Sequence, residues 1–194
     1  MDFGGGFGER LDRLDEAVGL IRRLLDGERF THQGQSYRMH DALLAPLPVQ
    51  RRLPILIGGS GPTKTLRTTA RYADMWNGFG PPGRIADISE TLRQRCDEIG
   101  RPFDAIERTV TTHVVIRDTA AEATAAWDET ARHHGIVGRI GADGTGRGLT
   151  VGGPPAVVNS YLDDYRDVGI GEVVIVFRAP FDLETIGRLG ELRS

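Results

Sequence analysis

The sequence predicts an α/β protein with a parallel sheet, and two observations lead to that prediction. Apolar, strand-like runs alternate with amphipathic helices along most of the 194 residues. Each such run is also followed by a helix, as expected when strands that point the same way are joined by right-handed crossovers. Four strand–helix units follow one opening helix. This number of strands is too small to close an eight-stranded barrel.

The opening helix is predicted from Glu9 to Leu25, because apolar residues recur there at three- and four-residue steps. Gly27 marks its end. Its charged residues are expected to form exposed pairs that contribute a few tenths of a kcal/mol each. These residues are Asp12, Arg13, Asp15, Glu16, Arg22 and Arg23.

Residues 28–53 are predicted to form an excursion from the core. A small hairpin is expected from Arg29 to Arg38, with its turn at Gln33-Gly34. Pro46 and Pro48 then mark an extended connector into the first strand of the sheet.

The sheet is predicted to begin with the short apolar run from Pro54 to Ile57. A helix from Thr63 to Ala73 and a strand from Met75 to Gly78 follow. The next helix is expected from Arg84 to Ile99. Cys96 lies on its apolar stripe, and we therefore predict that this single cysteine is a core residue.

The second half repeats the pattern with a long strand predicted from Arg108 to Ile116. Thr119 and Glu122 have the spacing of a capping box for a helix that reaches about His134. Residues 135–153 are rich in glycine and are expected to be irregular.

The last elements are a helix from Pro154 to Val168 and a buried strand from Glu172 to Phe177. Asp182 is placed to cap a short final helix that ends at Leu192.

Composition narrows the class of partner. The formal net charge is −3 and no long run of Lys or Arg occurs, so neither nucleic acid nor an anionic membrane is an expected partner. Small molecules fit better. No secretory apolar segment follows Met1 and no apolar stretch approaches bilayer length, which makes the cytoplasm the expected location.

The turn after the first strand of the sheet is a candidate anion site. Gly58, Gly59 and Gly61 allow a ligand to approach the backbone closely, and Pro62 suits a helix start. A phosphate or carboxylate would be favoured by the helix dipole and its free N–H groups. A tight turn without a ligand fits the local pattern equally well, because the P-loop ending and the dinucleotide spacing are both absent.

The histidines give weaker candidates. His113 lies in a predicted strand, where a lone histidine is more often a satisfied core group than an acid or base. His133 and His134 end a helix, which suits their charge, and no second set of ligands stands at metal spacing nearby. We therefore predict no metal site.

Several segments together carry a resemblance to a known family. They are GERLDRLDEA at 8–17, GQSY at 34–37, PLPVQ at 46–50, PILIGGSG at 54–61, ARYADMWN at 70–77, and VGGPP at 151–155 followed by VG at 168–169 and the strand at 172–177. This ordered series resembles the bacterial luciferase-like monooxygenase family. The resemblance implies an (α/β)₈ barrel enzyme that uses reduced FMN or the deazaflavin coenzyme F-420, and the subgroup resembled most uses the deazaflavin.

The resemblance also implies that the chain begins at the family's fourth helix. Residues 1–194 would then form a single partial barrel domain, about the C-terminal half of a TIM barrel. The strands at 54–57 and 172–177 would become open edges. A homodimer or a separate N-terminal partner chain is expected to cover them.

The resemblance further implies a set of cofactor-binding residues. The loop after the family's fifth strand binds the cofactor's phosphate and side chain, and Trp76 and Asn77 match an aromatic wall and an amide that end the sixth strand. A structural role for Trp76 in filling the barrel interior stays open. Gly152 and Gly153 offer a second anion site, weakened by the two prolines that follow. The implied cofactor-binding residues are Gly58, Gly59, Ser60, Gly61, Thr63, Trp76 and Asn77.

The function implied is that of a flavin- or deazaflavin-dependent oxidoreductase, with this chain supplying the phosphate side of the cofactor site. Catalytic residues are unknown, because the family's polar catalytic groups come largely from strands that have no counterpart here. The alternative is a non-catalytic half-barrel that acts as a cofactor-binding or interaction module, or a truncated gene product. The substrate is not predicted.

Overall fold

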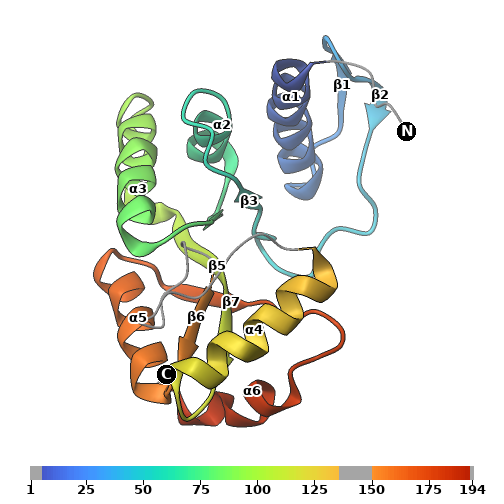
Figure 1. Ribbon diagram of the computed structural model, residues 1–194. Helices are drawn as coiled ribbons and strands as arrows, with labels where there is room; N and C mark the ends of the chain where they lie inside the picture. Colours follow the sequence, from blue (N-terminus) through green and yellow to red (C-terminus); the bar gives the residue numbers. More distant parts are fainter. Residues whose placement is uncertain (1–5, 136–149, 193–194) are drawn as a thin grey trace. The chain divides into compact units, whose positions relative to one another are not determined.

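The computed structural model describes residues 6–135 and 150–192 (Figure 1). Contacts divide this part of the chain into two compact units. The first unit is residues 6–76 and 88–107, and the second is residues 77–87, 108–135 and 150–192. We describe each unit by itself. The assignment of residues 1–194 to a single domain therefore stays a prediction.

The first unit holds two helices, a hairpin and the beginning of the main sheet. Its elements are α1 (Phe7–Leu25), β1 (Phe30–Gln33), β2 (Arg38–Ala42), β3 (Leu56–Gly58), α2 (Thr65–Tyr72), the start of β4 (Met75–Gly78), most of α3 (Pro82–Asp97) and a 3₁₀ turn (Phe103–Ala105). The predicted opening helix is confirmed. Its Val18 packs against Ile57 of β3 and against Ala73, so α1 is held by burial of its apolar stripe.

Arg22 corrects one prediction made for α1. Its residue is only 8% exposed, and its guanidinium donates to the Leu53 carbonyl at 3.1 Å and to the Asp74 carboxylate. Its contact with Asp26, four residues further along the helix, is longer, at 3.9 Å. The exposed-pair prediction is wrong for Arg22. Its guanidinium can be buried because it forms an ion pair with Asp74, a residue distant in the sequence.

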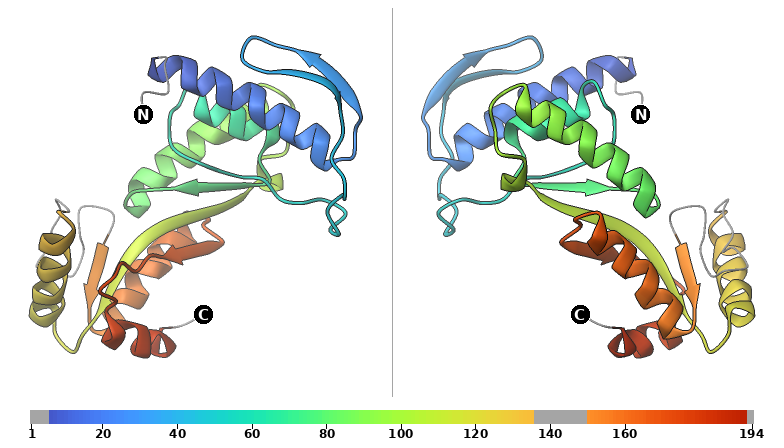
Figure 2. Two further views of the ribbon diagram at one scale, coloured as in Figure 1. Left: turned by 90° about the vertical axis from the view of Figure 1, so that its right-hand side faces the viewer. Right: turned by 90° about the vertical axis from the view of Figure 1, so that its left-hand side faces the viewer.

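The hairpin β1–β2 is confirmed, with Gln33 opposite Arg38 in an antiparallel register. Figure 2 shows it beside α1 from both sides. Glu16 of α1 fastens its turn: the carboxylate contacts His32 Nε2 at 2.9 Å and accepts the N–H groups of Ser36 and Tyr37 at 3.0 and 3.1 Å. The hydrogen bond from His32, ahead of the other contacts, holds the pKa of Glu16 below its usual value.

Replacing Gly34 in this turn is expected to loosen the hairpin. A Cβ on Gly34 would lie 1.8 Å from Oε1 of Glu16 and 2.3 Å from Nε2 of His32, so Gly34→Ala must displace the carboxylate. Its displacement breaks the bonds that this carboxylate makes with His32, Ser36 and Tyr37, so we expect the free energy of unfolding to fall. Urea unfolding measures it. Gly187→Ala is the control, because no atom lies within 4 Å of a Cβ there, and equal losses in the two variants would contradict this account.

The unit at 54–78 is confirmed as strand, turn, helix and strand, but two of its elements have other bounds. The first strand is Leu56–Gly58 instead of 54–57, so Gly58 ends the strand. The helix is shorter than predicted. It begins at Thr65 and ends at Tyr72 instead of spanning 63–73. The Leu66 N–H donates to the Gly61 carbonyl at 3.0 Å, so the chain first makes a turn through 62–64 and only then becomes helical. Pro62 therefore lies in this turn and not at the first helical position.

The second unit is built on the long strand β5 (Glu107–Ile116), whose residues from Arg108 onward belong to it. Its other elements are the end of β4, the first turn of α3, α4 (Ala120–His134), β6 (Thr150–Gly153), α5 (Pro155–Asp167), β7 (Glu172–Ile175), α6 (Leu183–Arg188) and a 3₁₀ turn (Leu189–Glu191). β7 runs parallel to the first half of β5, with Thr109 opposite Glu172. The predicted parallel α/β class is confirmed.

Strand β6 corrects the expectation that residues 135–153 are irregular. Thr150–Gly153 pairs in parallel with His113–Ile116 and contacts both α4 and α5 (Figure 2). Two of its four residues are glycines, which strands disfavour, so its pairing comes from β5 and the covering helices. The part of that prediction concerning residues 136–149 lies outside the described residues.

Local capping predictions are confirmed in this unit. The Thr119 side chain accepts the Glu122 N–H at 3.2 Å, and the Glu122 carboxylate accepts the Thr119 N–H at 3.0 Å, which completes the capping box. Asp182 caps α6 by accepting the Thr185 N–H at 3.1 Å. Both helix starts could be placed from sequence because their bonds join residues three positions apart.

Two further expectations concern the whole described chain. Cys96 is fully buried, as predicted, and burial raises the pKa of its thiol. No described helix combines the length and the apolar character needed to cross a membrane.

Candidate cofactor site

The predicted anion loop follows β3 in the first unit. Gly59 has a φ of 122°, a conformation that side-chain-bearing residues rarely adopt. A Cβ on Gly59 would lie 3.2 Å from Cγ2 of Thr65, and one on Gly61 would lie 2.9 Å from Oγ1 of the same residue. The loop is therefore folded tightly against the start of α2: a side chain at Gly59 would be strained, and one at Gly61 would displace the Thr65 hydroxyl.

Backbone donors are available at this loop. Within the first unit, no described residue accepts a hydrogen bond from the backbone N–H of Ser60 or of Thr63. Helix α2 begins just beyond them, at Thr65, and the positive end of its dipole favours an anion. The arrangement suits a phosphate or a carboxylate.

Lys64, the lysine that follows the loop, has another role. Lys64 Nζ contacts both carboxylate oxygens of Asp12 at 2.6 and 2.7 Å and donates to the Gly8 carbonyl at 3.1 Å. It thereby ties the start of α2 to α1. The ammonium group is therefore engaged away from the loop, while the guanidinium of Arg95 contacts it, with Nε donating to the Pro62 carbonyl at 3.1 Å.

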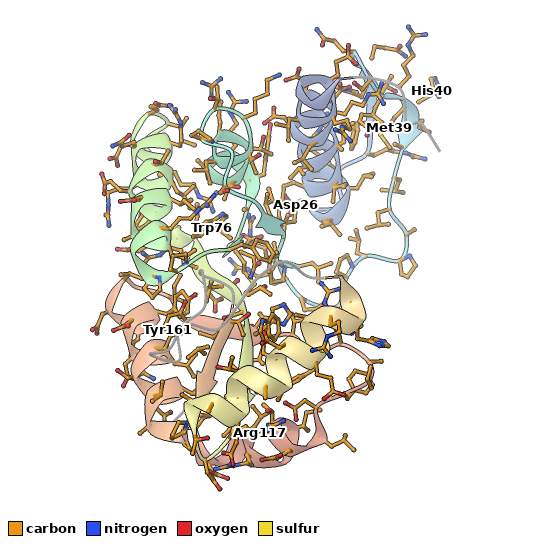
Figure 3. The ribbon with its side chains drawn as sticks, in the orientation of Figure 1. Asp26, Met39, His40, Trp76, Arg117 and Tyr161 are labelled. Carbon is orange, nitrogen blue, oxygen red and sulfur yellow. The ribbon has the colours of Figure 1, made fainter. Side chains whose placement is uncertain are left out.

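Trp76 lies beneath the loop as a buried residue of β4 (Figure 3). Its side chain is inaccessible to solvent, with an exposed fraction of 0%, and its indole N–H donates to the Gly59 carbonyl at 2.7 Å. The ring thus fills the interior, and its polar edge contacts the loop from inside. Direct contact of the ring with a ligand stays a prediction.

Asn77 belongs to the second unit. Its side-chain Nδ2 donates to Thr109 Oγ1 at 2.8 Å, and its Oδ1 accepts from Thr111 Oγ1 at 3.0 Å. The amide therefore joins the end of β4 to two threonines on one face of β5. Its contact with a cofactor or substrate stays a prediction.

The structure thus brings six of the seven predicted residues together in one unit, and it describes the seventh in the other. The six are Gly58, Gly59, Ser60, Gly61, Thr63 and Trp76. Sequence alone indicated the turn, but the bond from Trp76 to Gly59 joins residues 17 positions apart and has no local signal.

The second candidate anion site, at Gly152 and Gly153, is less accessible than the loop after β3. Gly152 and Gly153 are buried in β6, and the Gly153 carbonyl accepts the Arg117 N–H at 3.1 Å. Pro154 and Pro155 follow and have no N–H to donate. This end of α5 offers fewer donors than the loop after β3.

His113 is a half-buried group in β5. Its Nδ1 lies 3.0 Å from the Val176 carbonyl, and its ring centroid is 5.2 Å from that of Trp127. Burial, ahead of the opposing bond to Val176, lowers the pKa of this imidazole. His113 is therefore neutral at neutral pH and engaged within its own unit.

His133 and His134 contact each other edge to face at the end of α4, with centroids 4.8 Å apart. In the described ranges, 6–135 and 150–192, no three His, Cys, Asp or Glu residues are grouped so that they could hold a metal ion.

A partly buried carboxylate just before β4, bonded to the residue that precedes β3, was missed by sequence reasoning. Asp74 accepts the Ile55 N–H at 2.8 Å and Arg52 Nε at 2.7 Å, and it also accepts from Arg22. Burial by itself raises the pKa of Asp74, but these bonds and the two guanidinium charges outweigh it and hold the pKa below its usual value. The available signal was an aspartate inside the otherwise apolar run at 73–76.

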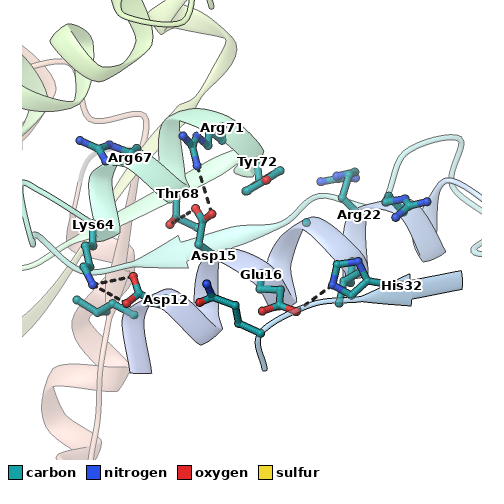
Figure 4. A pocket seen from close by; sticks show the side chains of 15 residues that line it. Asp12, Asp15, Glu16, Arg22, His32, Lys64, Arg67, Thr68, Arg71 and Tyr72 are labelled. Atoms are coloured by element: carbon teal, nitrogen blue, oxygen red, sulfur yellow. Dashed lines mark hydrogen bonds and ion pairs between the residues drawn. The ribbon is translucent and has the colours of Figure 1, made fainter. Parts of the chain in front are cut away.

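A groove of about 650 Å³ lies between α1, the hairpin and α2 (Figure 4). Its three carboxylates already have partners: Asp12 binds Lys64, Asp15 accepts from Thr68 at 2.7 Å, and Glu16 holds His32. The carboxylates of this groove are therefore already engaged within the first unit.

Parallel strands, crossover helices and a glycine loop at a strand's carboxyl end define the class of barrel-derived α/β proteins that bind ligands at those ends. Residues 2–170 match the family model described as luciferase-like monooxygenase, and the chain belongs to that family. The predicted resemblance is confirmed.

Two curated relatives are named as F-420-dependent enzymes. The F-420-dependent glucose-6-phosphate dehydrogenase of Microbacterium testaceum (strain StLB037) is 34% identical over 125 residues, which are 61% of this chain and 37% of that protein. The corresponding enzyme of Nakamurella multipartita is also 34% identical over 125 residues, 61% of this chain and 36% of its own length. The matching region thus spans little more than a third of these relatives.

Solved structures share the fold. An F-420-dependent secondary alcohol dehydrogenase in complex with an F-420–acetone adduct is similar with a TM-score of 0.73 at 16% identity, over 89% of this chain and 57% of that one. A long-chain alkane monooxygenase gives a TM-score of 0.70 at 16% identity, over 100% and 59%. The chain therefore corresponds to somewhat more than half of each of these structures.

Proposed function

We propose that this chain carries the phosphate-side half of the cofactor site of a flavin- or deazaflavin-dependent oxidoreductase. The observation that carries the proposal is the loop after β3. Gly59 and Gly61 leave no room there for a side chain, while the Ser60 N–H has no acceptor in the described part of its unit. Family membership supports an oxidoreductase, and the relatives' names support coenzyme F-420 as the cofactor.

The residues present fit a phosphate group. Backbone amides of residues 58–61 and 63 would hold it, since a loop without side chains lets phosphate oxygens reach the N–H groups. Reduced FMN and reduced F-420 both carry such a group, and either supplies the redox chemistry when bound. This chain's part is to bind and orient the cofactor tail.

A complete site is proposed to need a second chain. Among the described residues, β7 pairs only with β5, and β3 pairs only with β4. A groove of about 440 Å³ beside β7 is lined by apolar side chains, among them Ile170, Val173 and Ile175. A homodimer or an N-terminal partner chain would cover these edges, in the cytoplasm expected for such a protein.

One observation favours a second candidate function. The matches cover only 36–37% of the curated relatives' lengths, and the catalytic groups of the class are not assigned to any residue here. A non-catalytic half-barrel that binds a cofactor, or an interaction module, fits that partial coverage. A truncated gene product fits it as well.

Titration of the purified chain distinguishes these functions. We expect FMN or coenzyme F-420 to bind, seen as a change in cofactor fluorescence, and riboflavin, which lacks the phosphate, to bind at least tenfold more weakly. Light scattering after size-exclusion chromatography should give about twice the 21.2 kDa of one chain. Equal affinity for FMN and riboflavin would contradict the phosphate site, and a stable monomer would contradict the homodimer.

A further inference from the structure

The starting observation is the bond between a buried indole and the candidate loop. Trp76 Nε1 lies 2.7 Å from the Gly59 carbonyl, and its side chain has an exposed fraction of 0%. Both residues belong to the first unit, where Gly59 follows the end of β3 and Trp76 lies within the neighbouring strand β4. The indole is fixed by packing, so its N–H donor has a set direction.

That direction decides how the next peptide group points. A trans peptide is planar, and its C=O and N–H point to opposite sides. Because Trp76 holds the Gly59 carbonyl toward the interior, the N–H of Ser60 in the same peptide group points away from Trp76. The Ser60 N–H therefore faces the side of the loop on which a bound anion would lie.

The loop needs such an external constraint. Gly59 has a φ of 122°, and glycine has little intrinsic preference among the conformations open to it. Without the indole bond, the peptide between residues 59 and 60 has a second orientation, in which the carbonyl takes the place of the N–H. A carbonyl oxygen at that place would repel an anion.

We infer that Trp76 is a positioning residue of the phosphate site: its indole N–H, through the Gly59 carbonyl, orients the Ser60 amide toward the phosphate of the cofactor. The inference rests on the proposed function. It assigns Trp76 a role by hydrogen bonding from beneath the loop, in place of the aromatic wall that sequence suggested.

The test compares FMN with riboflavin on the native chain and on Trp76→Phe. We expect Trp76→Phe to weaken FMN binding by roughly tenfold to a hundredfold, the loss that follows when a hydrogen bond to a charged group is removed. Riboflavin binding should change less than twofold, because riboflavin has no phosphate. A merely structural role for Trp76 would weaken both ligands equally, and that result would overturn the inference.

Two further variants separate the N–H group from the ring. Replacing Trp76 by 3-benzothienylalanine, which has the same shape but sulfur instead of N–H, should reproduce the loss seen with Trp76→Phe and keep the thermal unfolding midpoint. Trp127→Phe removes another buried indole, 4% exposed and in the second unit, and should leave the FMN preference intact. Full FMN affinity in the benzothienyl variant overturns the inference.

The outcomes also separate this inference from the proposed function. A native chain that binds FMN no better than riboflavin refutes the phosphate site itself. A native chain with that preference, together with a Trp76→Phe variant that keeps it, refutes only the role of the indole.

Discussion

Gly59→Asp is expected to abolish FMN or F-420 binding. Two effects act together. The new side chain must adopt a φ of 122° with its Cβ 3.2 Å from Thr65 Cγ2, and its carboxylate lies where the phosphate would bind. At about 4 Å, repulsion between unit charges amounts to about 1 kcal/mol in water and about 4 kcal/mol near a protein surface. A loss of affinity of about fivefold to a thousandfold follows from the charge alone.

Two matched variants separate charge from backbone strain. Ser60→Asp places a carboxylate in the same loop at a residue that does not have a positive φ, so it should lose affinity while its thermal unfolding midpoint stays close to that of the native chain. Gly187→Asp adds the same charge where a Cβ meets no atom within 4 Å, and it should bind normally. Cofactor fluorescence titration measures all three. Undiminished affinity in Gly59→Asp and Ser60→Asp would place the anion site elsewhere.

Asp74→Asn is expected to give the largest loss of stability. The Asp74 carboxylate accepts bonds from Ile55 N–H, Arg52 and Arg22, and the Arg22 side chain is only 10% exposed. Removal of one charge from a buried pair leaves the other without compensation, which costs about 3–5 kcal/mol. Because Asn still accepts one bond and Arg52 is 54% exposed, we expect a loss of about 3 kcal/mol in urea unfolding.

The control for this variant uses the same arginine. Asp26 lies 3.9 Å from Arg22 and is 48% exposed, so Asp26→Asn should cost less than about 0.5 kcal/mol. Comparable losses in Asp74→Asn and Asp26→Asn would contradict the assignment of Asp74 as the principal partner.

Stability should depend on pH in a way set by Asp74. Its pKa is lower in the folded chain than its ordinary value, so its contribution is complete above about pH 4 and is lost as the pH falls through the lowered, folded-state pKa. The difference in unfolding free energy between the native chain and Asp74→Asn should therefore be full at pH 6 and shrink toward pH 2. If this difference in unfolding free energy grows on acidification, the pKa of Asp74 is raised by folding and not lowered, and the assignment is contradicted.

Features that depend on neighbours in sequence could be predicted. The apolar spacing of residues 9–25 gave α1, and the Thr119–Glu122 spacing gave the start of α4, because each rests on contacts between residues three or four positions apart. The β-rich run at 108–116 likewise predicted β5. The glycines at 58, 59 and 61 marked the candidate loop, since a close backbone turn has few other solutions.

Features that depend on partners distant in the sequence could not be predicted. Strand β6 forms because β5 offers it a free edge, although two of its four residues are glycines. Arg22 is buried because its charge is compensated by an ion pair with Asp74, 52 residues later. For the same reason, the indole of Trp76 gained its position under Gly59 only in the folded chain.

The sequence by itself therefore determined the order of the strands and helices other than β6, the parallel α/β class, the family and the place of the glycine loop. Local periodicity, capping chemistry and backbone freedom encode these features within a few residues. Only the tertiary structure decided which charges are buried, where the short strand β6 pairs, and which way the peptide after Gly59 points. These depend on hydrogen bonds between residues far apart in the chain, whose partners are set by packing.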